Sequence, residues 1–182
     1  MTLQELFEIR CTDNSDISEH LPILKKYGDK CASVIEFGVS RGYSTTAFLY
    51  SSCKKIISYD INDIQEFKKI LCTLEQYDNK FEFRQASSLA TTIENTDILF
   101  IDSLHTHDQL LNELLMHSMK AKKYIIIHDV ITFGIKGEFN NPRGLLEAIF
   151  RFLITSKDGK NWRLKELLTN NNGLLVIERI CE

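Results

Sequence analysis

Strand-like and helix-like segments alternate along most of the 182-residue chain. Short segments rich in Ile, Val and Phe, typical of buried strands, occupy residues 33–37, 55–60, 97–102 and 123–128, and residues 81–85 show the alternation of a further strand. Before, between and after these segments, the sequence predicts helices over residues 16–27, 41–52, 62–77, 107–120 and 143–155. Strands that alternate with helices indicate a parallel sheet with helices on both faces.

The C-terminal part of the chain has a different pattern. Strand-like segments 162–169 and 173–180 flank Asn170-Asn171-Asn172, a turn signal that predicts a hairpin. The expected fold is therefore α/β and Rossmann-like, with a doubly wound, seven-stranded, mostly parallel sheet that ends in an antiparallel hairpin. This layout differs from the all-parallel, six-stranded dinucleotide-binding sheet. Because no linker or repeat interrupts the pattern, we expect one domain over residues 1–182.

Composition excludes several classes of protein. The net charge of −3 provides no basic field for nucleic acid. The first ten residues lack the apolar core of a signal peptide, and no apolar stretch approaches the roughly 20 residues of a membrane span. The five cysteines are scattered without zinc-ligand spacing. We therefore expect a cytoplasmic protein with reduced thiols, a small-molecule partner, and no nucleic-acid or membrane partner.

The segment VIEFGVSRGYST, residues 34–45, combines a strand end, a glycine-bearing turn and the start of a helix. That order places backbone N–H groups beside a nucleotide-like ligand. Glu36 lies two residues before Gly38, where a carboxylate repels phosphate but can pair with a cation. This favours S-adenosylmethionine, which carries a sulfonium and an ammonium group, over NAD. Ser44 stands in the first helical turn, either as a ligand-binding residue or as a cap.

Polar residues follow each predicted parallel strand, at the edge where ligands of such sheets bind. They are Glu36, Asp60, Ser87 with Ser88, Asp102, and His128 with Asp129. Asp60 can accept both hydroxyls of a ribose, or alternatively it caps the next helix. Ser87 and Ser88 are candidates for contact with adenine, although serines are also common loop residues. Five such strand ends together predict one shared cleft.

A second cluster combines carboxylates with imidazoles. Asp102 and Asp129 end neighbouring strands, so they can hold Mg²⁺ or a related divalent cation. His105 and His128 are candidate general bases for a substrate hydroxyl, because an unperturbed imidazole titrates near neutral pH. Asp102 joins these two histidines as the third candidate catalytic residue.

With these residues in place, the chain resembles class I S-adenosylmethionine-dependent methyltransferases. It is most similar to the small branch that includes macrolide-sugar O-methyltransferases and cephalosporin-hydroxylase-like proteins. The resemblance rests on VIEFGV (34–39), FIDSLHTH (100–107), IIHDV (126–130) and NNNGLLVIER (170–179). It implies that Asp60 binds the ribose and that Asp102 lies beneath the sulfonium. It also implies that the methionine part of the cofactor is surrounded by Glu36, Gly38, Ser40 and Gly42.

The chain departs from the family pattern at two positions. His128 precedes Asp129 where metal-dependent relatives have an acidic pair, and Ser40 stands where many methyltransferases have glycine. The resemblance implies O-methylation of a small hydroxylated acceptor, such as a sugar or glycosylated metabolite, with Mg²⁺ as an optional cofactor. Two alternatives stay open: an inactive cofactor- or nucleoside-binding module with the same fold, and an NAD-dependent oxidoreductase. The acceptor pocket is either open or completed by a second subunit of a homo-oligomer.

Overall fold

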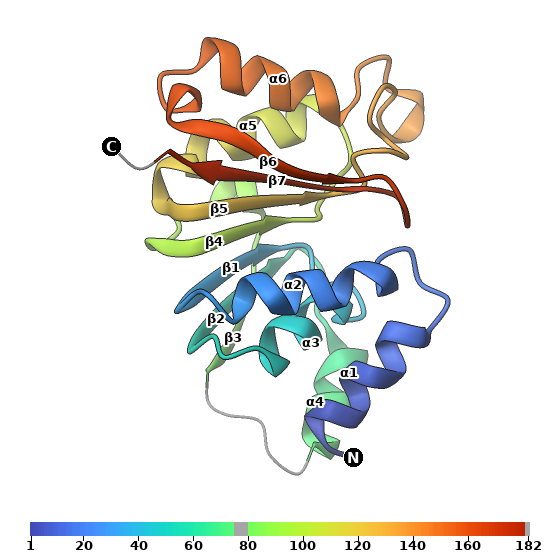
Figure 1. Cartoon of the computed structure of the whole chain (residues 1–182). Helices are drawn as coiled ribbons and strands as arrows, with labels where there is room; N and C mark the ends of the chain where they lie inside the picture. The colour runs from blue at the N-terminus through green and yellow to red at the C-terminus, as the bar shows by residue number, and fades with distance from the viewer. Residues whose placement is uncertain (75–79, 181–182) are drawn as a thin grey trace.

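The computed structural model describes residues 1–74 and 80–180. Its seven strands form one sheet in the order β3-β2-β1-β4-β5-β7-β6, as Figure 1 shows. Strand β7 pairs antiparallel with β5 and β6, and the other pairs are parallel. This arrangement confirms the predicted fold. The strands are β1 (Ser33–Phe37), β2 (Lys55–Asp60), β3 (Phe81–Gln85), β4 (Thr96–Ile101), β5 (Ala121–His128), β6 (Trp162–Leu168) and β7 (Leu174–Arg179).

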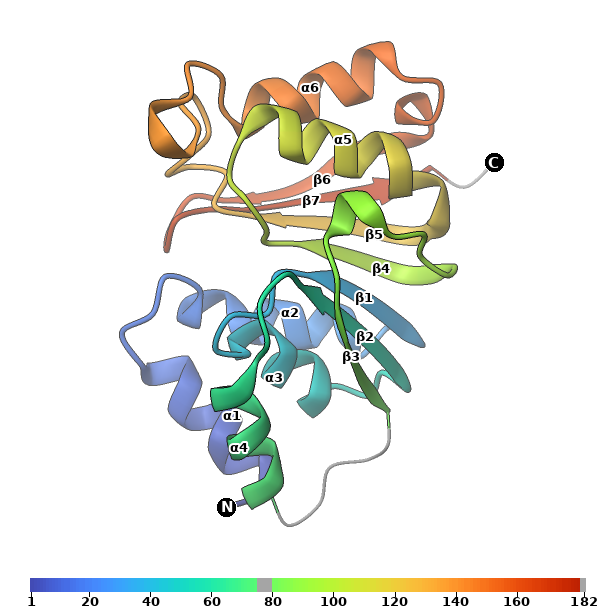
Figure 2. The ribbon, with the colours of Figure 1, turned by 180° about the vertical axis from the view of Figure 1, so that it is seen from behind.

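Helices cover both faces of the sheet, as Figures 1 and 2 show from opposite sides. One face carries α1 (Leu3–Thr12), α2 (Leu21–Gly28), α3 (Tyr43–Tyr50) and α4 (Gln65–Thr73), and the other carries α5 (His107–His117) and α6 (Leu145–Thr155). Successive strand residues face opposite sides, so both sides of each central strand must be apolar. Short 3₁₀ helices occupy Ser18–His20, Ser88–Ala90, Ser118–Lys120, Glu138–Asn140 and Gly159–Asn161.

Most differences from the expected elements lie at helix ends. The expected helix 16–27 is a 3₁₀ turn followed by α2, in which Pro22 occupies the first turn, where a missing N–H costs nothing. Helix α4 begins at Gln65, and its expected end near residue 77 lies outside the described residues. Helix α1 is not among the expected elements. Its start carries a recognisable signal, because Thr2 and Glu5 form a capping box.

A glycine sets the distance between the ends of β1 and β4. Gly38 has a φ of 86°, a conformation that favours glycine. A Cβ atom at this position would lie 1.9 Å from the carbonyl oxygen of Asp102. Gly38 therefore brings the turn after β1 against the residue that follows β4, and these two strand ends border the candidate site.

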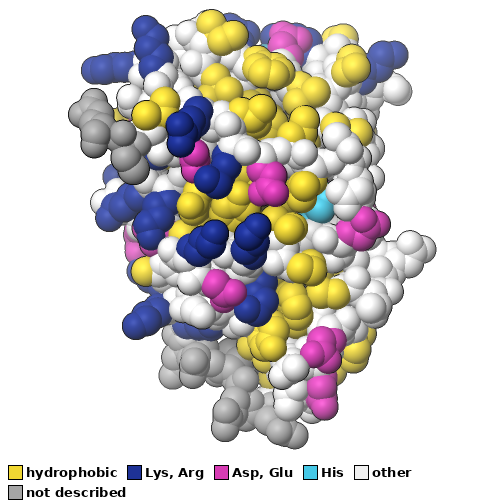
Figure 3. Space-filling view, in the orientation of Figure 1, with side chains coloured by type: hydrophobic (Ala, Val, Ile, Leu, Met, Phe, Trp, Pro, Cys, Tyr) yellow, Lys and Arg dark blue, Asp and Glu magenta, His cyan; other side chains and the backbone are white. Residues whose placement is uncertain are grey.

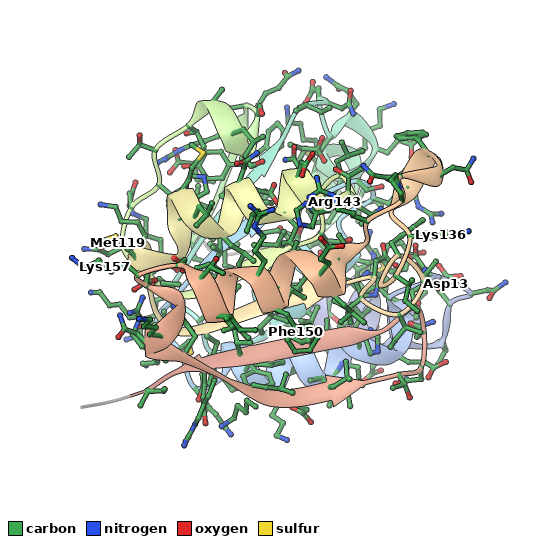
Figure 4. The ribbon with its side chains drawn as sticks, turned by 90° about the horizontal axis from the view of Figure 1, so that it is seen from above. Asp13, Met119, Lys136, Arg143, Phe150 and Lys157 are labelled. Atoms are coloured by element: carbon green, nitrogen blue, oxygen red, sulfur yellow. The ribbon has the colours of Figure 1, made fainter. Side chains whose placement is uncertain are left out.

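The loop between β5 and α6 lies at the same edge of the sheet. Figure 4 places its residue Lys136 at the opposite end of the molecule from Met119. Arg143 Nη2 lies 2.7 Å from Oδ1 of Asp108, which ties the loop to the start of α5. In the view of Figure 3, Lys and Arg side chains lie among acidic and hydrophobic ones. Within residues 1–74 and 80–180, no helix has the length and apolar character needed to cross a membrane.

Candidate active site

A cleft of about 630 Å³ opens at the carboxyl ends of β1, β2 and β4. This volume is within the range of sites for small molecules and cofactors. A cleft is therefore present at the predicted edge, but Glu36, His128 and Asp129 are not among the residues that line it. Seven of the residues singled out from the sequence line it: Gly38, Ser40, Asp60, Ser87, Ser88, Asp102 and His105.

Asp60 holds the turn after β1 and also borders the cleft. Its Oδ2 accepts hydrogen bonds from the backbone N–H groups of Val39 at 2.9 Å and Ser40 at 3.1 Å. Its Oδ1 accepts one from the N–H of Asn62 at 2.9 Å. Helix α4 has Ile64 as its N-cap, so Asp60 does not cap that helix. Binding of ribose by Asp60 stays a prediction.

Glu36 lies beneath the turn, and the structure corrects its expected role. Its side chain is fully buried, so it has no exposed surface for a cationic ligand. Oε1 accepts a hydrogen bond from the hydroxyl of Ser44 at 2.6 Å, and Oε2 accepts two more, from Thr45 at 2.7 Å and Ser58 at 2.5 Å. Burial raises the pKa of Glu36 to about 7, although these three hydrogen bonds oppose the rise. Glu36 thus joins β1, β2 and α3, and it is not among the residues that line the cleft.

Gly42 and Ser44 also support the turn without lining the cleft. Gly42 is the N-cap of α3 with a φ of 75°, and a Cβ atom there would lie 2.5 Å from the ring of Phe67. Ser44 is buried and donates its hydroxyl to Glu36. Contact of these two residues with a cofactor stays a prediction. Buried Arg10, which the sequence did not point to, donates to the carbonyl oxygens of Gly42 and, at 2.8 Å, Arg41.

His105 joins the carboxylates at the ends of β4 and β5. Its Nε2 lies 2.8 Å from Oδ2 of Asp129 and 3.3 Å from Oδ1 of Asp102. Its Nδ1 lies 3.1 Å from Oε2 of Glu138, and its ring stacks on Phe133 with centroids 4.8 Å apart. The structure therefore brings together the two motifs that the sequence placed after neighbouring strands. It adds Glu138 and Phe133 from the loop after β5.

His128 belongs to the same cluster but is buried deeper. Its side chain is 1% exposed, and its Nδ1 lies 3.5 Å from Oδ1 of Asp102 and 3.6 Å from Oδ1 of Asp129. Within the part of the chain that the structure describes, neither ring nitrogen of His128 has a hydrogen-bond partner. The ring of buried His20 meets it edge-on at 5.4 Å between centroids. The cleft wall includes His105 but not His128.

The carboxylates control the charge of both imidazoles. Burial lowers the pKa of His105 and of His128, but the nearby carboxylates of Asp102 and Asp129 outweigh it and raise each pKa to about 10. Burial raises the pKa of Asp129, and contact with the two imidazoles reverses this effect and lowers it below its usual range. The cluster thus favours imidazolium–carboxylate pairs. Only a neutral imidazole accepts a proton, so His105 or His128 must first lose its proton before it acts as a general base.

A buried carboxylate organises the other wall of the cleft. Oε1 of Glu113, on α5, accepts hydrogen bonds from the hydroxyls of Ser88 at 2.6 Å and Ser103 at 2.7 Å, and from the amide of Gln109 at 2.9 Å. Burial raises the pKa of Glu113. A charged residue between Leu110 and Leu114, on the apolar face of the helix, is the sequence signal that indicates such a role.

Comparisons with known proteins place this geometry in context. The family described as "Methyltransferase domain" matches residues 35–130, more than half of the chain. No curated protein matches the chain.

Many solved structures share the fold. A candidate caffeoyl-CoA O-methyltransferase from Staphylococcus aureus has a TM-score of 0.70 at 18% identity, covering 97% of this chain and 90% of that one. The O-methyltransferase from Bacillus cereus, in complex with S-adenosylhomocysteine, has a TM-score of 0.67 at 13% identity, with coverages of 97% and 90%. The N-methyltransferase NodS from Bradyrhizobium japonicum, also with S-adenosylhomocysteine, has a TM-score of 0.67 at 11% identity, with coverages of 98% and 99%.

Proposed function

The chain belongs to the methyltransferase domain family, and we propose that it transfers a methyl group from S-adenosylmethionine to a hydroxyl oxygen of a small acceptor. Because the solved structures share less than 25% identity with this chain, they establish the fold and not the acceptor atom. The observation that carries the proposal is the convergence of Asp102, His105 and Asp129 at one end of the cleft that Asp60 borders. Such a cluster serves deprotonation of a hydroxyl, for example on a sugar or glycosylated metabolite.

The cleft residues fit the donor. Asp60 presents a carboxylate for the ribose hydroxyls, and the turn at Gly38 and Ser40 provides backbone for the methionine part. Of the two serines, Ser87 is the freer to meet adenine, because the hydroxyl of Ser88 already donates to Glu113. When bound, S-adenosylmethionine supplies a methyl group on a positively charged sulfur, which keeps the electron pair of the bond that breaks.

His105 is the residue we assign to the acceptor proton. Its side chain is 22% exposed and lines the cleft, whereas His128 is closed off behind it. The carbonyl oxygen of His105 accepts a hydrogen bond from the N–H of Glu138 at 2.8 Å, which fixes the segment that carries the imidazole. The rest of the rate enhancement comes from holding donor and acceptor in near-attack geometry, which lowers the activation barrier by about 7–11 kcal/mol in well-oriented systems.

A divalent cation fits the same end of the cleft. Asp102 and Asp129, with His128, offer ligand atoms that all lie within 4.8 Å of one another. These side chains would hold the ion, and its chemistry is to lower the pKa of a bound hydroxyl and to orient the oxygen. A cation on the carboxylates also removes the attraction that keeps His105 protonated.

Calorimetry with S-adenosylhomocysteine, and with NAD as the alternative ligand, tests the donor. We expect heat with S-adenosylhomocysteine only, and no heat at millimolar concentration would overturn the proposal. Transfer of a labelled methyl group to a panel of hydroxylated acceptors then tests the reaction. Binding without transfer would favour the second candidate function, a cofactor-binding module. The observation behind that candidate is the raised pKa of both imidazoles, which favours the protonated form that cannot act as a base.

A further inference from the structure

Three side chains at the ends of β4 and β5 offer a mixed set of donor atoms. Asp102 and Asp129 provide carboxylate oxygens, and His128 provides an imidazole nitrogen. Carboxylates and water suit Mg²⁺, whereas imidazole suits Zn²⁺, Fe²⁺ and related transition metals. The histidine therefore changes which ion the site prefers, relative to a site made of carboxylates alone.

The burial of His128 points to a ligand that completes its surroundings. Its side chain is 1% exposed, and neither ring nitrogen has a hydrogen-bond partner among the described residues. Oδ1 of Asp129, on a side chain that is 4% exposed, likewise lacks a hydrogen-bond partner in the described part of the chain. Nδ1 of His128 and Oδ1 of Asp129 face each other at 3.6 Å, beyond hydrogen-bond distance, so a group bound between them would satisfy both buried atoms.

The distances suit direct coordination. Nδ1 of His128 lies 3.5 Å from Oδ1 of Asp102 and 3.6 Å from Oδ1 of Asp129. Two donor atoms at the usual bond length from a tetrahedral zinc-like ion lie roughly 3.4 Å apart. His105 leaves Oδ1 of Asp129 available, because it approaches the other oxygen, Oδ2, at 2.8 Å.

We infer that Asp102, His128 and Asp129 bind a divalent transition-metal ion in preference to Mg²⁺. This inference deepens the proposed function, since the ion lies at one end of the same cleft. It also separates the two histidines, which the sequence left as equivalent candidates for the base. His128 holds the metal, and His105, which lines the cleft, faces the acceptor.

The test is calorimetric titration of the full-length protein, kept reduced with a phosphine, with Co²⁺ and separately with Mg²⁺. We expect Co²⁺ to bind about a hundredfold more tightly than Mg²⁺ or better. The substitution His128→Asp should weaken Co²⁺ binding and strengthen Mg²⁺ binding, so that the preference falls at least roughly tenfold. His128→Ala should lose most of the Co²⁺ affinity.

His117→Gln is the matched control, because His117 is a buried histidine outside the cluster, where its Nε2 lies 2.8 Å from the carbonyl oxygen of Ser88. This variant should keep the Co²⁺ affinity of the native protein. Equal affinities for Co²⁺ and Mg²⁺ in the native protein, or Co²⁺ binding that survives His128→Ala, would overturn the inference. The comparison of Co²⁺ and Mg²⁺ affinities in the native protein does not depend on whether the variants fold. Binding of S-adenosylhomocysteine, measured in parallel, separates failure of the metal site from failure of the proposed function.

Discussion

Nε2 of His105 lies 2.8 Å from Oδ2 of Asp129, and this contact joins the segments that follow two neighbouring strands, β4 and β5. Asp129 has a φ of 62°, in the left-handed region, which is uncommon for a residue other than glycine. Strained backbone of this kind persists where the surroundings hold it, often at functional sites. Through its contacts with Asp129 and Glu138, His105 therefore connects the end of β4 with the end of β5 and the loop after it.

Replacing His105 tests its assignment as the base. His105→Gln should lower kcat by about 10²–10⁴-fold, the usual contribution of general-base catalysis, while the affinity for S-adenosylhomocysteine stays the same. Calorimetry and a labelled-methyl assay measure the two quantities separately. Turnover at the native level would remove His105 from the mechanism.

Asp60→Asn tests the donor pocket. Loss of the negative charge that accepts ribose hydroxyls should weaken binding of S-adenosylhomocysteine by roughly 10–100-fold. Asp60 also holds the N–H groups of Val39 and Ser40, so a thermal melt must accompany the calorimetry. The control is Asp63→Asn, because Asp63 lies in the same loop and pairs with Lys68. Equal affinity in the native protein and the Asp60 variant would contradict the assignment.

The raised pKa of Glu36 predicts that the free energy of unfolding depends on pH. Its pKa rises from 4.5 in the unfolded chain to about 7 in the folded protein, mainly through burial. The folded state thus binds this proton more tightly, so the stabilisation is complete below pH 4.5 and is lost as the pH rises through 7.

Urea unfolding at pH 5 and pH 8 measures this effect. The free energy of unfolding should fall more between these pH values in the native protein than in Glu36→Gln. The exposed control Glu66→Gln should follow the native protein. The same fall in Glu36→Gln and in the native protein would show that Glu36 does not titrate in this range.

Two substitutions in the turn after β1 should change the free energy of unfolding in opposite directions. Gly38→Ala adds a Cβ atom 1.9 Å from the carbonyl of Asp102 and should lower the free energy of unfolding by about 2–4 kcal/mol. Ser40 has a φ of 49°, so Ser40→Gly should raise that free energy by up to about 1 kcal/mol. Denaturant unfolding checks both. A stable Gly38→Ala protein would mean that the ends of β1 and β4 can move apart.

Much of the fold was predictable because the strands are buried on both faces. The apolar runs marked β1, β2, β4 and β5 to within two residues, and the asparagine turn marked the β6–β7 hairpin. Helix ends were harder: the helix expected from residue 16 begins as a 3₁₀ turn, and α4 begins at Gln65 instead of residue 62. The capping box of Thr2 and Glu5 is a local signal that predicts α1.

By itself, the sequence determined that polar side chains follow the parallel strands, and hence that they share one edge of the sheet. Only the tertiary structure decided which of them face the cleft. Glu36 turns towards α3 and meets hydroxyls from α3 and β2, whereas Asp60 and Asp102 border the open space. It likewise distinguished partly exposed His105 from fully buried His128. The physical reason is that burial and hydrogen-bond partners come from segments far apart in the chain, which no local pattern of residues records.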